Sequence, residues 1–344
     1  MNVRGAAERA FRSCFLWLSR RRSLGRLAAA LPFTRPMVAR FVAGQSLDAA
    51  LPALRRAKGA GFRTTVDILG ESVTSLDAAR AAADDYVAAI RVLEREELDL
   101  NVSVKLSQMG LGIDPAAARD NLARILLAAS EVGAFVRIDM EDHSTTDATL
   151  DLWRQLRPAM AGSGDVGVVI QSALRRSEAD VKALVADRAR VRLCKGAYAE
   201  PPEVAFTTKA EVDAAYVRLL ERLLAEGSYP ALATHDDRMV EHAIAFARDH
   251  EISPDRFEVQ MLYGVRRDLQ ERLLREGWRV RVYVPLGDRW WPYFMRRLAE
   301  RPANVTFLVA SLWRERRQAR PEPLPAAQPE PEPEAPRDDA SPPR

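Results

Sequence analysis

The chain has 344 residues, 47% of them hydrophobic and 29% charged, so it is long enough to bury the core of one large domain or two ordinary ones. Its net charge of +3 is uneven, because residues 1–40 carry nine arginines and one acid, whereas residues 321–344 carry six acids and two arginines. The body between them is close to neutral, so its charge does not indicate nucleic-acid binding, and we expect none.

The chain has two cysteines, Cys14 and Cys194. Two widely separated thiols argue against a disulfide framework and a cysteine-based zinc site, and they fit a reducing compartment. We therefore expect a cytoplasmic protein that binds no metal.

Residues 1–45 form a basic N-terminal segment in which we expect extra helices. Its apolar run at 14–19 is far too short to span a bilayer. The segment either packs on the body of the protein or lies on an anionic membrane surface, and in the second case Phe15, Leu16 and Trp17 would supply the apolar contacts.

Residues 46–313 repeat one pattern, in which short β-prone runs alternate with longer segments of helical spacing. The β-prone runs lie at 63–69, 100–106, 134–140, 166–171, 189–194, 230–234, 257–261 and 280–284. The helical segments include 75–97 and 203–226, and capping signals occur at Ser75, at Asp114 with Pro115, and at Ser177.

Eight strands that alternate with helices over about 250 residues predict an α/β fold, a (β/α)8 TIM-like barrel. A doubly wound open sheet is the competing architecture. It is disfavoured because no G-x-G-x-x-G motif follows the first strand.

The C-terminal residues 314–344 are expected to form a disordered tail. Nine of the 21 prolines fall within residues 321–344, and such a composition supports neither a helix nor a core.

Polar side chains recur at seven of the eight predicted strand ends, where one or two would suffice for capping. Each alone reads more simply as a solvated loop charge or a cap, but catalytic groups of such barrels lie at these ends. The residues are Lys105, Asp139 with Glu141 and Asp142, Gln171, Arg192 with Lys195, Thr234 with His235, Gln260 and Tyr283.

The residue types at these ends point to a particular kind of ligand. Lys105, Arg296 and Arg297 are cations suited to a small carboxylate. Tyr293 shares a helix face with the two arginines and would pack over an apolar part of the same ligand. Gln171, Arg192 and the backbone of the sequence KGA offer donors for an electron-rich heterocycle or a phosphate.

Several motifs then match one known family. The stretches RLCKGAY (192–198), ATHD (233–236), FEVQMLYGVR (257–266), RVYVPLG (281–287) and WPYFMRRLAERPANVTFL (291–308) resemble proline dehydrogenase in its monofunctional bacterial form. The stretches VSVKLSQMGLGID, VRIDMED and GVVIQSALRR agree with it in order and spacing. The resemblance covers roughly residues 40–312.

The resemblance implies a role for each matching residue. Lys105, Arg296 and Arg297 would bind the proline carboxylate, and Tyr283 and Tyr293 would line the substrate pocket. Asp139 and Arg192 would form the central catalytic pair, with Arg192 near the flavin N5 atom. The positions expected to bind the flavin are Met140, Gln171, Arg192, Lys195, Gly196, Ala197, Thr234 and His235.

The resemblance also implies a reaction and partners. The enzyme would use FAD to oxidise L-proline to Δ1-pyrroline-5-carboxylate and pass the electrons to a quinone, the first step of proline degradation to glutamate. A quinone acceptor suggests peripheral contact with the inner face of the membrane. A separate pyrroline-5-carboxylate dehydrogenase would take the product.

Two other functions remain open at this point. A Schiff-base aldolase or lyase could use Lys105 or Lys195 as its nucleophile on the same barrel. A membrane-associated scaffold without catalytic activity is the third class, although none of the expected strand-end groups is missing.

Overall fold

The structure is a computed structural model that describes residues 38–160 and 164–300. The helices expected before residue 38 and the disordered tail expected at 314–344 lie outside the described residues. So does the predicted boundary between residues 313 and 314. The boundary between residues 45 and 46 stays a prediction.

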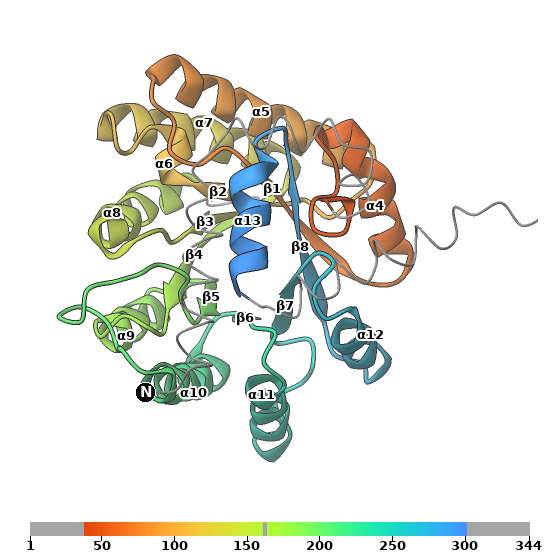
Figure 1. Ribbon diagram of the computed structural model, residues 1–344, viewed down its shortest axis with the longest axis vertical. Helices are drawn as coiled ribbons and strands as arrows, with labels where there is room; N and C mark the ends of the chain where they lie inside the picture. Colours follow the sequence, from red (N-terminus) through yellow and green to blue (C-terminus); the bar gives the residue numbers. More distant parts are fainter. Residues whose placement is uncertain (1–37, 161–163, 301–344) are drawn as a thin grey trace, which may run out of the picture. The chain divides into compact units, whose positions relative to one another are not determined.

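Eight parallel strands close into a barrel in the order of the sequence, from β1 to β8 (Figure 1). This confirms the predicted (β/α)8 architecture, and the open doubly wound sheet is wrong. The strands are β1 Arg63–Ile68, β2 Asn101–Lys105, β3 Phe135–Asp139, β4 Asp165–Gln171, β5 Val191–Cys194, β6 Ala231–Ala233, β7 Glu258–Leu262 and β8 Val280–Leu286.

Helices follow the strands, with an additional helix before β1, and they lie around the outside of the barrel except for the last helix, Trp290–Glu300, which lies in front of it (Figure 1). They are α4 Leu47–Gly59, α5 Leu76–Arg95, α6 Leu106–Met109, α7 Pro115–Val132, α8 Thr146–Leu156, α9 Ser177–Ala186, α10 Lys209–Glu226, α11 Asp237–Asp249, α12 Arg267–Arg275 and α13 Trp290–Glu300. Two short 3-10 helices, η1 His143–Thr145 and η2 Arg157–Met160, flank α8. Within the described residues, no helix combines the length and the apolar run needed to cross a bilayer.

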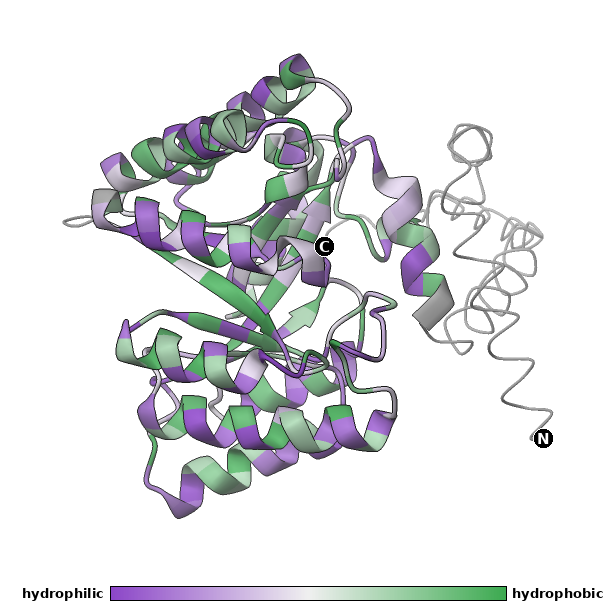
Figure 2. Ribbon diagram, turned by 90° about the vertical axis from the view of Figure 1, so that its left-hand side faces the viewer, coloured by the Kyte–Doolittle hydropathy of each residue, from purple (hydrophilic) through white to green (hydrophobic). Residues whose placement is uncertain are grey.

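The strand sequences alternate between two environments. One set of alternate residues, such as Val102 and Val104 of β2, belongs to the hydrophobic core that includes the surrounding helices. The other set, such as Ser103 and Lys105, belongs to buried polar networks that join several strands of the barrel. Figure 2 shows hydrophobic and hydrophilic residues alternating along both the helices and the strands. The barrel interior therefore contains networks of buried polar and charged side chains.

Two of the three predicted helix starts are confirmed by capping hydrogen bonds. The side chain of Ser75 accepts a bond from the Ala78 amide before α5, and that of Asp114 accepts one from Ala116 before α7, where Pro115 opens the helix. The third helix, α9, also begins at the predicted residue, Ser177, but Arg176 occupies the N-cap and no side chain caps the helix. The Ser177 hydroxyl instead donates to the Gln171 carbonyl at 2.6 Å and so ties α9 to the end of β4.

Most predicted boundaries shift by one or two residues, and tertiary contacts explain two of the differences. The helical segment expected from residue 203 begins at Lys209, behind a capping box formed by Thr208 and Glu211. The preceding residues pair with the β4–α9 loop, where the Phe206 amide donates to the Ala173 carbonyl at 2.8 Å. Strand β8 continues beyond Val284 to Leu286, because the ladder with β1 extends through Pro285.

Gly167 of β4 makes room for a buried cation. A methyl group at this position would overlap the Arg190 carbonyl oxygen and lie 2.6 Å from an Arg137 guanidinium nitrogen. The Arg137 guanidinium donates to the Val168 carbonyl at 2.9 Å, and its side chain is almost completely buried. A side chain larger than hydrogen at residue 167 would therefore displace a buried cation from its hydrogen bonds.

We expect the substitution Gly167→Ala to lower the free energy of unfolding by about 2 kcal/mol or more, because overpacking and lost hydrogen bonds add. Urea denaturation followed by circular dichroism measures the change. The matched control is Gly112→Ala, since a methyl group there would meet nothing within 4 Å. Equal stability of the two variants would contradict this account of Gly167.

Candidate active site

The C-terminal ends of the eight parallel strands meet at one mouth of the barrel, where the sequence predicted the functional residues. Four of these residues form one buried network: Lys105 of β2, Asp139 of β3, Arg192 of β5 and Tyr283 of β8. The network thus joins residues from four strands that are distant in sequence.

The Lys105 ammonium is the centre of this network. It donates to Asp67 Oδ1 at 2.8 Å, to the Tyr283 hydroxyl at 3.1 Å and to Asp139 Oδ2 at 3.2 Å. The Tyr283 hydroxyl in turn donates to Asp139 Oδ2 at 2.8 Å. Register explains part of this arrangement, since Lys105 lies directly beside Asp139 in the β2–β3 ladder.

Arg192 is held on three sides by hydrogen bonds. Its guanidinium donates to Asp139 Oδ1 at 2.6 Å, to Ser103 Oγ at 2.9 Å and to Gln260 Oε1 at 2.5 Å. The planar guanidinium is therefore fixed in both position and orientation before any ligand arrives.

The network continues below the mouth through Gln260. Its amide nitrogen donates to Glu258 Oε1 at 2.5 Å, and the same oxygen accepts a bond from Arg281 Nε at 2.7 Å. Arg281 also donates to the Thr64 carbonyl at 2.6 Å. Glu258 and Arg281 thus form a buried ion pair under the predicted site.

The electrostatics of the network favour its charged form. Burial alone would lower the pKa of Lys105, but Asp67, Tyr283 and Asp139 outweigh it and raise that pKa well above its ordinary value. Burial would likewise raise the pKa of Asp139, yet Lys105 and Arg192 hold it below its usual range. Burial, then Asp139 and Asp67, raise the pKa of Tyr283, which therefore keeps its proton.

An ammonium in this setting is a poor nucleophile. A Schiff base forms from the neutral amine, and Lys105 is held in its charged form by its carboxylate partners. Lys195, the other lysine considered for such a role, donates to Asp213 Oδ1 at 2.6 Å and to Asp236 Oδ2 at 2.8 Å. The geometry therefore disfavours the aldolase reading.

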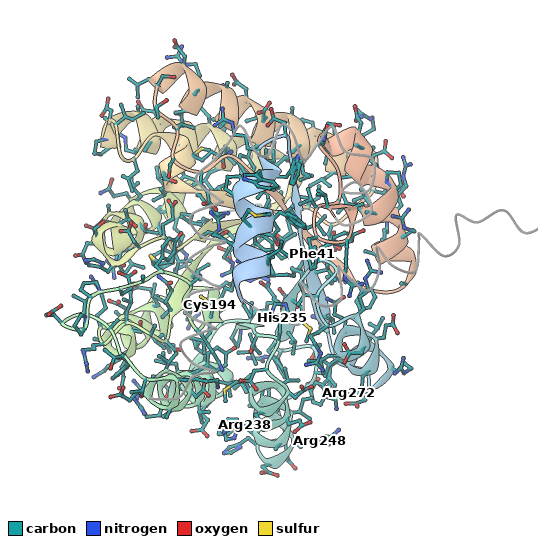
Figure 3. The ribbon with its side chains drawn as sticks, in the orientation of Figure 1. Phe41, Cys194, His235, Arg238, Arg248 and Arg272 are labelled. Atoms are coloured by element: carbon teal, nitrogen blue, oxygen red, sulfur yellow. The ribbon has the colours of Figure 1, made fainter. Side chains whose placement is uncertain are left out.

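A second group of predicted residues lies at the ends of β3 to β6, and most of its polar side chains already have protein partners. The Gln171 amide nitrogen donates to the Glu141 carbonyl at 2.8 Å. Thr234 Oγ1 accepts a bond from the Asp236 amide at 3.1 Å, and His235 Nε2 accepts one from the Leu262 amide at 2.9 Å. Met140 is buried. Figure 3 shows Cys194 and His235 near the centre of the barrel, whereas Arg238, Arg248 and Arg272 lie at its periphery on α11 and α12.

The backbone after β5 is open to a ligand. Gly196 and Ala197 are exposed, and Gly196 has φ +109°, a conformation that favours glycine. A Cβ atom on Gly196 would lie 3.1 Å from Gln171 Oε1. A side chain here would therefore crowd the polar side chain predicted to line the cofactor site.

Helix α13 carries the last three predicted residues, and Figure 1 shows this helix in front of the barrel. Arg296 donates to Glu71 Oε1 at 2.9 Å, and the Arg297 guanidinium lies 5.1 Å from the centre of the Tyr293 ring. Tyr293 is buried.

Tyr198 lies within the electrostatic reach of both Lys105 and α13. Partial burial, followed by the carboxylates of Glu71 and Glu141, raises the pKa of Tyr198, although 42% of its surface is exposed. Lys105 and Arg296 oppose that rise. Groups from β2, the β1–α5 loop, the β3–η1 loop and α13 thus influence the ionisation of one side chain.

The sequence analysis missed two residues that bind this network, Asp67 and Ser103. It also missed two partners of other predicted residues, Glu71 of Arg296 and Asp213 of Lys195. Asp67 is the most important omission. It lies at the end of β1, the one predicted strand end for which no polar residue was proposed. It is also the ionisable residue within the otherwise uncharged run TTVDIL, a signal that was available. Asp213 and Glu71 lie outside the strands, where sequence alone offered no pairing.

Comparisons with known proteins agree with the fold and the motifs. The family model described as proline dehydrogenase matches residues 50–310. Proline dehydrogenase from Deinococcus radiodurans is 42% identical, over 79% of this chain and 89% of that protein. Proline dehydrogenase 2 from Bacillus subtilis (strain 168) is 38% identical, over 86% of this chain and 96% of that protein.

A solved structure is similar in its fold. The crystal structure of proline utilization A (PutA) from Bdellovibrio bacteriovorus, inactivated by N-propargylglycine, aligns with a TM-score of 0.72 and 30% identity. The alignment covers 77% of this chain and 32% of that chain, so the present chain spans about a third of the larger protein.

The Glu258–Arg281 pair gives a prediction for stability against pH. Burial alone would raise the pKa of Glu258, but Arg281 outweighs it and lowers that pKa from 4.5 to about 2. Because the folded-state pKa is depressed, the stabilisation is complete above pH 4.5 and is lost as the pH falls toward 2. Its full size is about 3 kcal/mol at 1.4 kcal/mol per pKa unit.

We expect the unfolding free energy of the native protein to exceed that of a Glu258→Gln variant at pH 7, and the gap to narrow progressively below pH 4.5. Urea denaturation of both proteins between pH 7 and pH 3 measures it. A gap that stays constant over this range would contradict the ion-pair assignment.

Proposed function

The chain belongs to the proline dehydrogenase family and is an oxidoreductase acting on proline, and from this premise we propose how its site performs the reaction. The chain would use FAD to oxidise L-proline to Δ1-pyrroline-5-carboxylate. The observation that carries the proposal is the buried network of Lys105, Asp139, Arg192 and Tyr283 at the barrel mouth. Family membership and this network support each other, because the family motifs contribute these four residues.

We assign the substrate carboxylate to Lys105, Arg296 and Arg297. Lys105 is an ammonium kept charged in a buried setting, and the guanidinium groups of α13 can offer a fork to a carboxylate. The aromatic rings of Tyr283 and Tyr293 would line the apolar part of the pocket. Holding the carboxylate in this way fixes the ring of the substrate, so that much of the catalysis would come from positioning.

The residues around β5 fit FAD. Their exposed backbone at Gly196 and Ala197 provides donors, and the absence of a Cβ at Gly196 leaves space beside Gln171. The residues proposed to hold the cofactor are Met140, Gln171, Arg192, Lys195, Gly196, Ala197, Thr234 and His235. When bound, FAD would supply the acceptor for a hydride from the ring carbon next to the substrate nitrogen.

Arg192 and Asp139 would then act as the central pair of the site. Arg192 is a buried cation fixed by three hydrogen bonds, so it can stabilise negative charge without reorganising. Asp139 keeps both Arg192 and Lys105 in place through its two carboxylate oxygens. The substrate amine must be neutral when the hydride leaves. The substrate carboxylate would stay bound to Lys105, Arg296 and Arg297 during this step.

We also propose that the electrons pass to a quinone and that a separate pyrroline-5-carboxylate dehydrogenase takes the product. The bifunctional protein PutA of Escherichia coli (strain K12) is 27% identical over 80% of this chain, which corresponds to 24% of that larger protein.

Contact with the inner face of the membrane stays a prediction, since the basic segment that motivates it lies outside the described residues.

We expect the purified protein to show flavin absorption bands that bleach on anaerobic addition of L-proline. Bleaching reports hydride transfer from the substrate, so it tests cofactor and substrate together. Bands that persist would contradict proline as the substrate. A colourless protein that stays inactive after incubation with FAD and is trapped by borohydride with a substrate would favour the Schiff-base alternative.

We expect the substitution Lys105→Met to raise the KM for L-proline at least tenfold, because a charge-assisted hydrogen bond to the substrate carboxylate is lost. A tenfold change corresponds to about 1.4 kcal/mol. Steady-state kinetics measure it, with circular dichroism to confirm folding. The control is Lys182→Met, an exposed lysine of α9. Equal KM values for the two variants would contradict the role of Lys105.

A further inference from the structure

Asp67 is a buried carboxylate that the proposed mechanism does not use. It lies at the end of β1 with 1% of its surface exposed. Oδ1 accepts a hydrogen bond from Lys105 Nζ at 2.8 Å, whereas Oδ2 has no hydrogen-bond partner among the described residues. Burying a carboxylate is expensive, so one held by a single ammonium calls for a reason beyond stability.

The bond to Asp67 is the shortest of the three that Lys105 makes. Asp139 Oδ2 is 3.2 Å from Lys105 and already accepts a bond from Tyr283, while Asp139 Oδ1 is held by Arg192. Asp139 therefore accepts hydrogen bonds from three donors, and the bond from Lys105 is the longest of the three. Among the described residues, Asp67 accepts a hydrogen bond from Lys105 alone.

We propose that Asp67 is a positioning residue for the substrate: it holds the Lys105 ammonium, charged, at the place where the substrate carboxylate binds. The inference rests on the proposed function, in which Lys105 binds that carboxylate. Asp67 touches neither substrate nor cofactor in this role and acts through Lys105.

The charge balance of the site supports this role. Asp67 and Asp139 together offset the charges of Lys105 and Arg192, so the four groups are neutral as a set. Without Asp67, Lys105 would share Asp139 with Arg192, and the incoming carboxylate would meet a lysine that loses its proton more easily. Burial raises the pKa of Asp67 despite the opposing effect of Lys105, so its ionised state depends on that lysine.

A binding measurement separates this role from a structural one. The ligand is cyclopentanecarboxylate, a carbocyclic analogue of proline that has no amine to titrate, and calorimetry on the FAD-loaded full chain gives its affinity between pH 7 and pH 9.5. The carboxylates that act on Lys105 are Asp67, Glu71, Asp139 and Glu141, with Arg192 bound to Asp139. The phenols are Tyr86, Tyr198 and Tyr283.

We expect the native affinity to change less than twofold over this range, because Lys105 keeps its proton. In Asp67→Asn the shape of the side chain is retained but its charge is lost, so the affinity should fall at least fivefold between pH 7 and pH 9.5. Adding Lys105→Met to this variant should abolish the pH dependence. Asp67→Glu keeps the charge but displaces the ammonium, so it should bind several-fold more weakly at every pH.

The matched control is Asp99→Asn. Asp99 lies just before β2 and accepts hydrogen bonds from two residues of β1, the Thr64 amide at 2.8 Å and Arg63 at 3.0 Å, but it lies at the opposite end of the strands. This control should bind like the native protein.

Two outcomes would overturn the inference and can be told apart. If Asp67→Asn and Asp67→Glu both bind like the native protein at every pH while Lys105→Met alone weakens binding, the role of Asp67 is wrong and the proposed function stands. If the native protein does not bind the analogue, or Lys105→Met binds it normally, the proposed carboxylate site fails and the role of Asp67 fails with it.

Discussion

The structure depends on a set of opposite charges that balance inside a closed barrel. Asp67, Lys105, Asp139 and Arg192 are each at least nine-tenths buried and are joined by ion pairs of 2.6–3.2 Å. Desolvating a single ion costs several kcal/mol, so such a set is tolerable only when every member has its partner. The strands β1, β2, β3 and β5 must therefore keep their positions relative to one another. A small shift of one strand along another would leave charged side chains unpaired.

This constraint explains why the lumen can be polar while the fold stays stable. The hydrophobic burial comes from the outward residues of the strands and from the helices, as with Val102, Val104 and the α5 residues Ile90 and Leu93. The lumen is then available for charges, provided that they pair. In its lower part, Arg137 and Arg281 donate to backbone carbonyls, and Arg281 also pairs with Glu258. The cost of burying these groups is offset by hydrogen bonds rather than by apolar contact.

Much of the fold was predictable from the sequence, because eight β-prone runs and capping residues such as Ser75 and Asp114 mark the elements directly. The mistakes arose where tertiary contacts override local signals. Ser177 looks like a cap but bonds to Gln171, and the segment before Lys209 looks helical but pairs with another loop. Neither partner is visible in the local sequence.

For the candidate site, the sequence could predict which residues lie at the strand ends, but not which of them pair. Strand ends could be identified because the barrel places them all at one mouth, and family motifs assigned roles to them. Pairings between strands, such as Lys105 with Asp67, could not be derived, because they depend on register around the closed barrel. The sequence shows an aspartate in a hydrophobic run; which cation neutralises it is a property of the three-dimensional structure.

The upper and lower parts of the lumen are not independent. Arg192 at the mouth is bound to Gln260, Gln260 is bound to Glu258, and Glu258 is bound to Arg281. The hydrogen bonds of a planar guanidinium fix its orientation. The orientation of Arg192 therefore depends, through Gln260, on the Glu258–Arg281 ion pair deeper in the barrel. Residues that look purely structural in the lower lumen therefore set the geometry of the cation that the reaction would use, and the fold and the chemistry of this barrel share one network.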